Sequence, residues 1–187
     1  NGISEEIANH IYDEMTDFAK YAFNKSHAAC YAVVAYRTAY LKAYYPAEFM
    51  ASMLNSFLGN LDKIPDYIEE CKRMGIEILK PDINKSFGKF TVEDGMIRFG
   101  LGSIKNVGTV PVENIVAERQ ENGEYKSFTD FCERMSEESV NKKCIESLIK
   151  AGTFTEFPET RATLLASFET IIDTIQSYNK KGMDGQV

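Results

Sequence analysis

The hydrophobic pattern at the start of the chain predicts two helices. Apolar residues recur at three- to four-residue steps over residues 3–20 and the opposite face is acidic, which is typical of an amphipathic helix. A longer helix is expected to begin at Ser26, its N-cap, and to end near Tyr44. Because this second helix is apolar on nearly every side, we expect most of it to be buried, with its tyrosines in the core.

Two shorter helices are predicted next. Pro46 breaks the pattern and precedes a helix expected over residues 47–57. A further helix is expected to begin at Asp62, its cap, and to end at Met74, where Gly75 stops it.

The character of the sequence then changes, and a small β element is predicted between the helical blocks. Residues 76–79 have a short strand pattern. Two further strand patterns, over residues 89–92 and 96–99, flank Glu93-Asp94-Gly95, which is a typical hairpin signal.

Short helices return in the second half of the chain. Each follows a turn or a capping residue, such as the capping-box pair Ser127 and Asp130. Four are predicted, over residues 109–120, 127–135, 140–151 and 159–178. The fold class is therefore mainly α with a small β element. The expected domains are helices over 1–80, a short β-hairpin connector over 81–100, a helical domain over 101–178 and a flexible tail over 179–187.

The overall charge limits the kinds of partner. The formal net charge is −7, which argues against a strong free-standing nucleic-acid binder, because such proteins normally have a basic face. Any DNA contact must therefore be local. The longest apolar run, residues 28–36, is too short to span a membrane, and no signal-peptide pattern opens the chain, so we expect a cytoplasmic protein. Its start, Asn-Gly-Ile-Ser without Met, fits an excised fragment, although a processed protein would look the same.

The cysteines predict structural thiols rather than a metal site. Cys30, Cys71, Cys132 and Cys144 form no C-x-x-C pair, and the chain has only 2 histidines, so zinc is not expected. Each cysteine lies among apolar helical residues, and we expect all four to be reduced and buried. Because the chain has no Asp-x-Asp pair and no hydrolase motif, we predict no catalytic residue, no metal site and no cofactor.

One candidate anion site is Lys25-Ser26-His27, at the expected start of the long helix. Free amides and the positive end of the helix dipole favour anions there. Lys25 and His27 add two donors that suit phosphate oxygens. A solvated helix cap with a basic flank explains the same residues.

A second candidate is the turn Asn106-Val107-Gly108, which looks like a helix-hairpin-helix turn, usually Gly-hydrophobic-Gly. Asn stands where the first glycine is usual, and Asn tolerates positive φ better than most residues. Amides at the start of the next helix would face a phosphate, in a sequence-independent contact. The predicted contact residues are Lys105, Asn106, Val107, Gly108 and Thr109. A hairpin used only for packing explains the pattern equally well.

A third candidate lies in the next helix pair, which has Gly152 at its turn. A local basic cluster occurs there despite the acidic total. The predicted phosphate contacts are Lys142, Lys143, Lys150 and Gly152. The alternative is a solvated helix face that ends in a glycine C-cap.

Longer motifs occur in a fixed order along the chain. They include Phe-Asn-Lys-Ser-His-Ala-Ala over 23–29, Tyr-Pro-Ala-Glu-Phe-Met-Ala over 45–51, Pro-Asp-Ile-Asn over 81–84, Ile-Arg-Phe-Gly-Leu-Gly-Ser-Ile-Lys-Asn-Val-Gly over 97–108 and Leu-Ile-Lys-Ala-Gly over 148–152. Together they resemble the alpha subunit of bacterial DNA polymerase III. The resemblance covers nearly the whole chain, from about Ile3 to Ile175.

The resemblance implies that residues 1–80 are the distal fingers and that residues 101–178 are a tandem helix-hairpin-helix domain that holds primer–template duplex DNA. Lys25, Ser26 and His27 would then contact the incoming dNTP. The parent would be a DNA-directed DNA polymerase that works with a sliding clamp and other replisome subunits. Its catalytic aspartates and Mg²⁺ would lie in a palm outside this chain, so the chain alone should be inactive.

Two other hypotheses remain open. A helical scaffold or protein-interaction module, with the hairpins used only for packing, is favoured by the acidic composition and the acidic first helix. A self-contained enzyme is the third, and no constellation of residues supports it.

Overall fold

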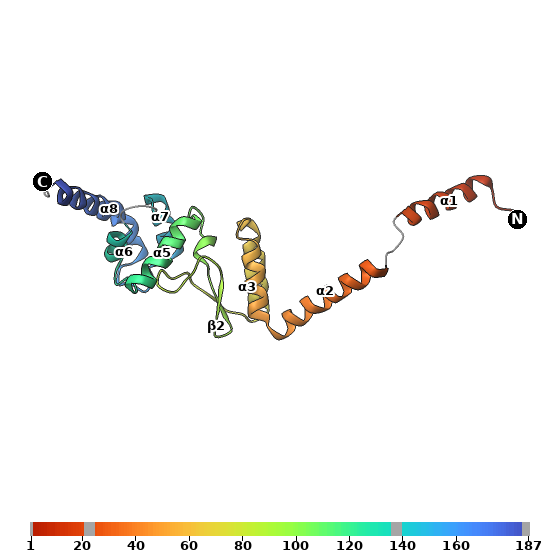
Figure 1. Cartoon of the computed structure of the whole chain (residues 1–187), viewed down its shortest axis with the longest axis horizontal. Coiled ribbons are helices and arrows are strands. Elements are labelled where there is room, and N and C mark those ends of the chain that lie inside the picture. Colours follow the sequence, from red (N-terminus) through yellow and green to blue (C-terminus); the bar gives the residue numbers. More distant parts are fainter. Residues whose placement is uncertain (1, 21–24, 136–139, 185–187) are drawn as a thin grey trace. The chain divides into compact units, whose positions relative to one another are not determined.

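A computed structural model describes residues 2–20, 25–135 and 140–184 (Figure 1). The predicted class, mainly α with a small β element, is confirmed. The chain divides into two compact units, residues 1–44 and 45–187. This division differs from the expected boundaries at 80 and 100, because the helices over 46–73 share a hydrophobic core with the strands that follow them.

The first unit contains helices α1 (Glu5–Lys20) and α2 (Lys25–Tyr44), close to the predicted spans. Ser26 lies inside the first turn of α2, so its prediction as the N-cap is wrong. The prediction that α2 is mostly buried is also wrong for this chain, since α2 holds no buried residue and Tyr36 is 72% exposed. An apolar helix is buried only where another element covers it, and no described element of this unit does so.

The second unit has two hydrophobic cores, and the first lies under α3 (Pro46–Ser56), the single turn η1 (Leu61–Lys63) and α4 (Ile64–Arg73). Asp62 therefore lies in a 3₁₀ turn and does not cap the helix. The Asn55 side chain clamps Phe90, donating to its carbonyl at 2.9 Å and accepting from its amide at 2.8 Å. This pair fixes α3 against the β element.

Three short strands form one sheet in the order β1-β3-β2: β1 (Ile78–Leu79), β2 (Thr91–Glu93) and β3 (Met96–Arg98). β2 and β3 are antiparallel, and Asp94 (φ 50°) and Gly95 (φ 79°) make the tight turn between them, which confirms the predicted hairpin. β1 lies parallel to β3, so the sheet is larger than a hairpin.

The second core lies among the single turn η2 (Leu101–Ser103), α5 (Thr109–Asn122), α6 (Phe128–Arg134), α7 (Lys142–Ala151) and α8 (Arg161–Asp184). Its centre is aromatic, and Phe154 meets Phe128 edge to face with ring centroids 5.0 Å apart. Ser127 accepts from the amide of Asp130, which confirms the predicted cap. α8 continues to Asp184, beyond its predicted end near Tyr178; the flexible tail expected over 179–187 stays a prediction, and 185–187 lie outside the described residues.

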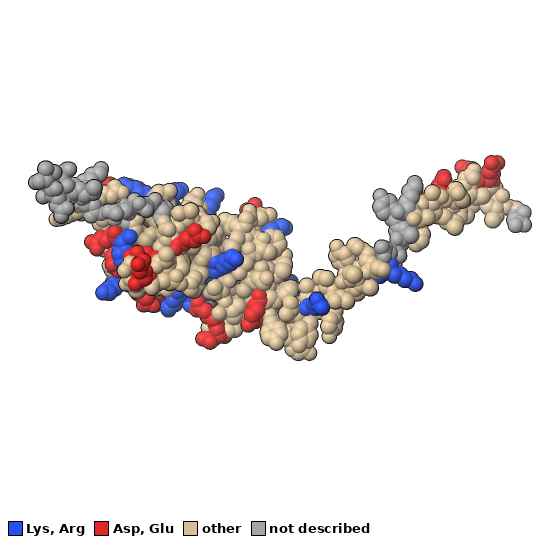
Figure 2. Space-filling view, viewed as in Figure 1, with Lys and Arg blue, Asp and Glu red and all other residues tan. Residues whose placement is uncertain are grey.

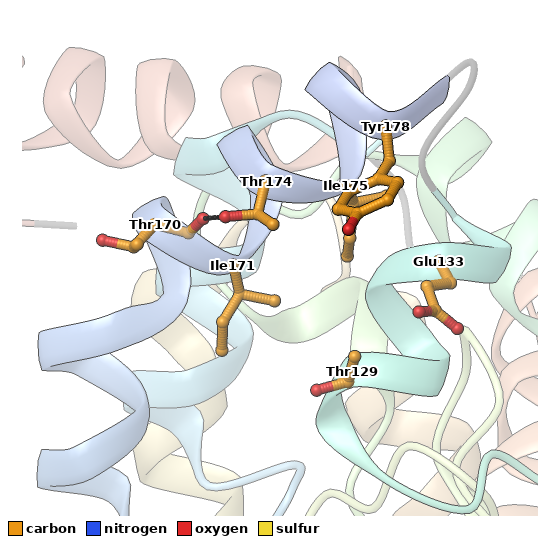
Figure 3. A pocket seen from close by; sticks show the side chains of 7 residues that line it. All are labelled: Thr129, Glu133, Thr170, Ile171, Thr174, Ile175 and Tyr178. Atoms are coloured by element: carbon orange, nitrogen blue, oxygen red, sulfur yellow. Dashed lines mark hydrogen bonds between the residues drawn. The ribbon is translucent and has the colours of Figure 1, made fainter. Parts of the chain in front are cut away.

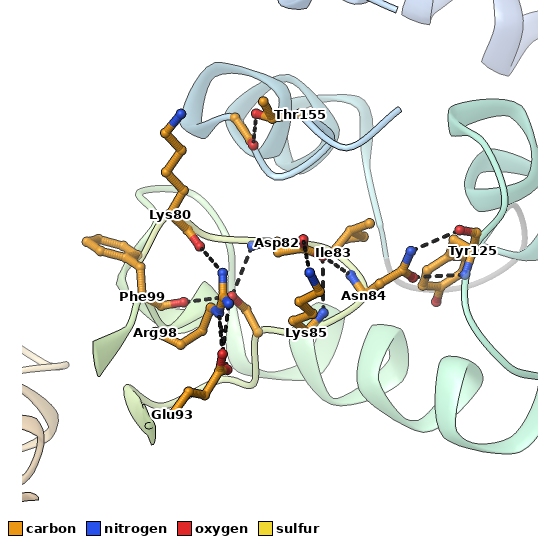
Figure 4. Close-up of polar contacts among 12 residues, drawn as sticks. Lys80, Asp82, Ile83, Asn84, Lys85, Glu93, Arg98, Phe99, Tyr125 and Thr155 are labelled. Atoms are coloured by element: carbon orange, nitrogen blue, oxygen red, sulfur yellow. Dashed lines mark hydrogen bonds and ion pairs between the residues drawn. The ribbon is translucent and has the colours of Figure 1, made fainter. Parts of the chain in front are cut away.

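The loop from Asp82 to Ser86 joins the two cores (Figure 4). Asn84 pairs with the backbone of Tyr125, donating to its carbonyl at 2.9 Å and accepting from its amide at 2.8 Å. Ser86 Oγ donates to the carbonyl of Phe99 at 2.8 Å, next to β3. Hydrogen bonds therefore connect this loop to the sheet on one side and to the helices on the other.

Two glycines allow the backbone to cross itself beside this loop. The amide of Gly102 donates to the carbonyl of Gly88 at 3.0 Å. A Cβ on Gly100 would lie 2.6 Å from the carbonyl carbon of Lys89, and one on Gly102 would lie 2.8 Å from the oxygen of Gly88. Both contacts are with backbone atoms, which cannot rotate away, so only glycine fits at these two positions.

We therefore expect Gly100→Ala to lower the free energy of unfolding by about 2 kcal/mol, the cost of overpacking a close contact. Gly59→Ala is the matched control, because a Cβ on Gly59 would meet nothing within 4 Å. Urea titration followed by circular dichroism measures both changes. Equal stability of the two variants would contradict the backbone crossing.

Candidate nucleic-acid interface

The turn at 105–109 is exposed and takes the conformation that a hairpin needs. Asn106 has φ 65°, in the left-handed region, as predicted for an Asn in place of a glycine. Val107 is buried and anchors the turn in the second core. Lys105, Gly108 and Thr109 are exposed, so a polyanion can reach this side of the turn.

Gly108 is the N-cap residue of α5, and the first helical residues after it, Thr109 and Val110, are exposed. Its backbone is extended (φ −77°, ψ 170°), and no side chain caps the helix. The first amides of an α-helix have no acceptor inside the helix, and the helix dipole makes this end positive. Because the first turn of α5 also lacks an acidic residue, the amides of Thr109 and Val110 form a natural anion site.

The structure brings the turn and α7 together. Asn106 Nδ2 donates to Ser147 Oγ at 3.3 Å, and Ser147 Oγ donates to the carbonyl of Lys143 at 2.9 Å. Lys143, Ser147 and Lys150 follow one another at four- and three-residue steps and so share a face of α7. Asn106 of the second candidate site therefore contacts the helix that carries the lysines of the third, which the sequence did not indicate.

The segment before the turn differs from that of a regular helix-hairpin-helix motif. The residues before it form η2, a single 3₁₀ turn, where an α-helix would usually stand. Leu101 donates its amide to the carbonyl of Phe87 at 2.8 Å, so this turn is held by the crossing chain. A short rigid connection therefore replaces the first helix.

Acidic residues offset the basic cluster on α7. Lys143 and Lys150 both form ion pairs with Glu146, and Lys142 forms one with Asp173 on α8. The hydrogen bond from Lys150, and then that from Lys143, lowers the pKa of Glu146 below its usual value. Figure 2 likewise shows acidic and basic side chains interspersed over the 45–187 unit on the face drawn. A phosphate would therefore compete with carboxylates for these lysines.

Gly152 is buried, in contrast to the exposed turn at Asn106. It has φ 84° and ends α7 as a left-handed C-cap, and its amide donates to the carbonyls of Leu148 and Ile149. A Cβ at this position would lie 2.5 Å from Nη2 of Arg161. Its predicted phosphate contact is therefore not available in this structure, because Gly152 is buried and its amide already donates to carbonyls at the end of α7.

Lys25, Ser26 and His27 are exposed in the first turn of α2. The rings of His27 and Tyr31 are 4.5 Å apart between centroids, so His27 packs along its own helix. These three residues belong to the first unit and the turn at Asn106 to the second. Their contact with a nucleotide stays a prediction.

Two open grooves were not predicted from the sequence. One, of about 570 Å³, lies between α6 and α8 and has an apolar floor of Ile171 and Ile175 (Figure 3). The other, of about 620 Å³, lies along α5 and includes Phe87, Val112 and Thr109. Both are formed by residues distant in sequence, so no local pattern could have indicated them.

The cysteine prediction is confirmed for three of the four residues. Cys71, Cys132 and Cys144 are buried free thiols, and burial raises the pKa of Cys132 to about 12 and that of Cys144 to about 11. Cys30 is exposed, so its predicted burial is wrong for the same reason as that of α2.

Within the part of the chain that the structure describes, no three His, Cys, Asp or Glu side chains are grouped so that they could hold a metal ion. Within the same residues, no helix combines the length and the apolar character needed to cross a membrane.

Comparison with known proteins agrees with this architecture. A family model described as a helix-hairpin-helix motif matches residues 75–164, which include the sheet as well as α5 and α7. The chain is 47% identical over 182 residues to "DNA polymerase III subunit alpha" of Borreliella burgdorferi, covering 96% of this chain and 16% of that protein. The protein of the same name from Thermus aquaticus is 44% identical over 186 residues, covering 100% and 15%. The chain thus spans about 16% of the length of such relatives.

The left-handed residue of the turn gives a test. We expect Asn106→Ala to be less stable than Asn106→Gly by about 1 kcal/mol, since Ala pays the steric cost of positive φ and Gly does not. Both variants lose the hydrogen bond to Ser147, so this bond cancels in the comparison. Thermal unfolding by calorimetry measures the difference. If the two variants were equally stable, the left-handed conformation at 106 would be wrong.

Proposed function

This chain belongs to the DNA polymerase III alpha subunit family, of whose members it matches one segment, and on that premise we propose that it is a non-catalytic, DNA-binding part of a DNA-directed DNA polymerase. Its role in this proposal is to hold the primer–template duplex. The single observation that carries the proposal is the exposed turn at Asn106, which leads into the exposed first turn of α5, where no side chain caps the positive end of the helix.

The contact is with the sugar–phosphate backbone and does not depend on sequence. The amides of Thr109 and Val110 bind one phosphate group, and Lys105 adds one charge beside them. Because the chain carries a net charge of −7, the site acts locally and the affinity of the isolated chain is low. Lys143 and Lys150 take part only when a phosphate displaces them from Glu146.

The other roles of the parent belong to the same proposal. Lys25, Ser26 and His27 contact the triphosphate of the incoming dNTP, which suits an exposed, basic helix start. Catalytic aspartates and Mg²⁺ are assigned to a palm outside this chain, as are the surfaces for the sliding clamp and other replisome subunits. Among the described residues, no three carboxylate, His or Cys side chains are grouped so that they could hold Mg²⁺.

The alternative is a helical interaction module whose hairpin serves only for packing. The observations that favour it are the ion pairs that occupy Lys142, Lys143 and Lys150, and the buried position of Gly152. Under this alternative, changes at the turn leave DNA affinity unaltered.

Removing one amide tests the proposal without changing charge. We expect Thr109→Pro to weaken binding to duplex DNA roughly tenfold, because a hydrogen bond to a charged group is lost. Pro suits this first helical position, and the extended backbone of Gly108 suits a residue before Pro. Thr109→Ala, which keeps the amide, should bind as the unchanged chain does. Fluorescence anisotropy at low salt, with two unrelated duplex sequences, measures the affinities.

Two charge variants complete the test. Lys105→Gln should reduce the slope of log affinity against log salt by about 0.9, the loss of one phosphate contact, while Lys72→Gln on α4 should not. Glu146→Gln should strengthen binding, since it releases Lys143 and Lys150. A gain of affinity cannot come from misfolding. If none of these variants changes DNA affinity or its salt dependence, the proposal is wrong and the packing alternative is favoured.

Primer extension tests the non-catalytic role. With Mg²⁺, all four dNTPs and a primed template, the purified chain should give no extended product, because two-metal phosphoryl transfer needs clustered carboxylates. The readout is a denaturing gel of labelled primer. Extension by the pure chain would overturn this assignment and favour a self-contained enzyme.

A further inference from the structure

Helix α1 exposes a row of large apolar side chains. Ile7, Ile11, Met15 and Phe18 recur at four-, four- and three-residue steps, so they share one face, and they are 48% to 70% exposed. Soluble proteins rarely leave so long an apolar stripe in water, and such a stripe usually marks a surface that another element covers. A 16-residue helix is also marginal in water without such cover.

Helix α2 carries a stripe of small residues at a matching spacing. Ala28, Ala32, Ala35 and Ala39 follow one another at four-, three- and four-residue steps and share one face of the helix. Small residues let another helix approach closely, and the bulky residues of a partner then fill the space between the two backbones. The stripe thus suits a partner with large apolar side chains at the same spacing.

The charges of the two helices are complementary. α1 carries five acidic residues and one lysine, namely Glu5, Glu6, Asp13, Glu14, Asp17 and Lys20. α2 carries Lys25, Arg37 and Lys42 and no acidic residue, which is unusual in a chain with a net charge of −7. Figure 2 shows no acidic side chain on α2 on the face drawn. An acidic partner helix therefore suits α2 better than a basic one.

We propose that α1 docks antiparallel on the alanine stripe of α2, within the same chain, to form a helical hairpin. Only residues 21–24 separate the two helices, a length typical of an αα-hairpin connection. Counting outward from this connection puts four apolar residues of α1 level with the four alanines. The levels are Phe18 with Ala28, Met15 with Ala32, Ile11 with Ala35 and Ile7 with Ala39.

The antiparallel direction agrees with two further properties of the helices. Their dipoles then oppose each other, and the acidic first turn of α1, Glu5 and Glu6, lies near the end of α2 that carries Lys42. The hairpin also covers α1 along its whole length, because α1 is about 24 Å long and α2 about 30 Å. Lys25, Ser26 and His27 lie at the tip, where the hairpin leaves them accessible.

Disulfide crosslinking in the whole chain tests this pairing. In a Cys30→Ser background, Ile11→Cys with Ala35→Cys should form an intrachain disulfide in high yield, since only close Cα atoms can be bridged. Two matched pairs should not. Tyr12→Cys with Ala35→Cys uses another face of α1, and Ile11→Cys with Ala28→Cys uses the right faces at the wrong level. Non-reducing gels and mass spectrometry at high dilution give the yields.

Hydrogen exchange of the α1 amides is a second test that needs no new bond. Ala35→Glu places a charge in the stripe and should speed their exchange roughly tenfold by undocking α1. Val34→Glu is the matched control, because it adds the same charge one residue away, on another face, at a position 55% exposed. Equal exchange in both variants, equal crosslinking of all three pairs, or crosslinks only between two copies would each overturn the intrachain hairpin. None of these outcomes bears on the DNA contact at Asn106.

Discussion

The hydrogen bonds of the loop from Asp82 to Ser86 are the constraint on which the larger unit depends. Asp82 Oδ1 accepts from the amides of Asn84 and Lys85, and these bonds fix the local turn of the loop. Asn84 then pairs with Tyr125, and the buried Arg119 donates to the carbonyl of Ile83 at 2.8 Å. Because these partners belong to the helical core while Ser86 bonds next to the sheet, one short loop sets the position of α5 and so of the candidate phosphate site.

Electrostatics explain how an acidic chain can still offer an anion site. The amides of Thr109 and Val110 are fixed dipoles in a helix turn that carries no acidic residue, whereas each lysine of α7 has an acidic partner. Fixed dipoles need no reorganisation when a phosphate arrives, and side-chain ion pairs must first be broken. In the proposed interface, the backbone amides therefore provide the phosphate contact, and the lysines modulate its strength.

Local patterns predicted the helices, the β-hairpin and the Asn106 turn, because each depends on neighbouring residues such as Asp94 and Gly95. Properties that depend on distant residues were not predictable in the same way. The burial of Gly152 depends on Arg161 and the end of α7, and the parallel pairing of β1 depends on a strand beyond the next loop. Helix α2 shows the opposite. Its apolar composition predicts a buried helix, but no described element of its unit covers it, and it holds no buried residue. The contact between Asn106 and Ser147 likewise could not be predicted from a local pattern, because 41 positions separate the two residues.

The parallel pairing of β1 with β3 has a consequence for the order of folding. The β2–β3 turn closes over two residues, while Ile78 must find Ile97 across a much longer loop. Loop-closure entropy therefore favours formation of the local β2–β3 hairpin first. β1 then pairs with the edge of β3 that β2 leaves open. Gly88, one side of the backbone crossing, lies inside that longer loop, whereas Gly100, the other side, follows β3, so the crossing requires the chain on both sides of the hairpin to be in place.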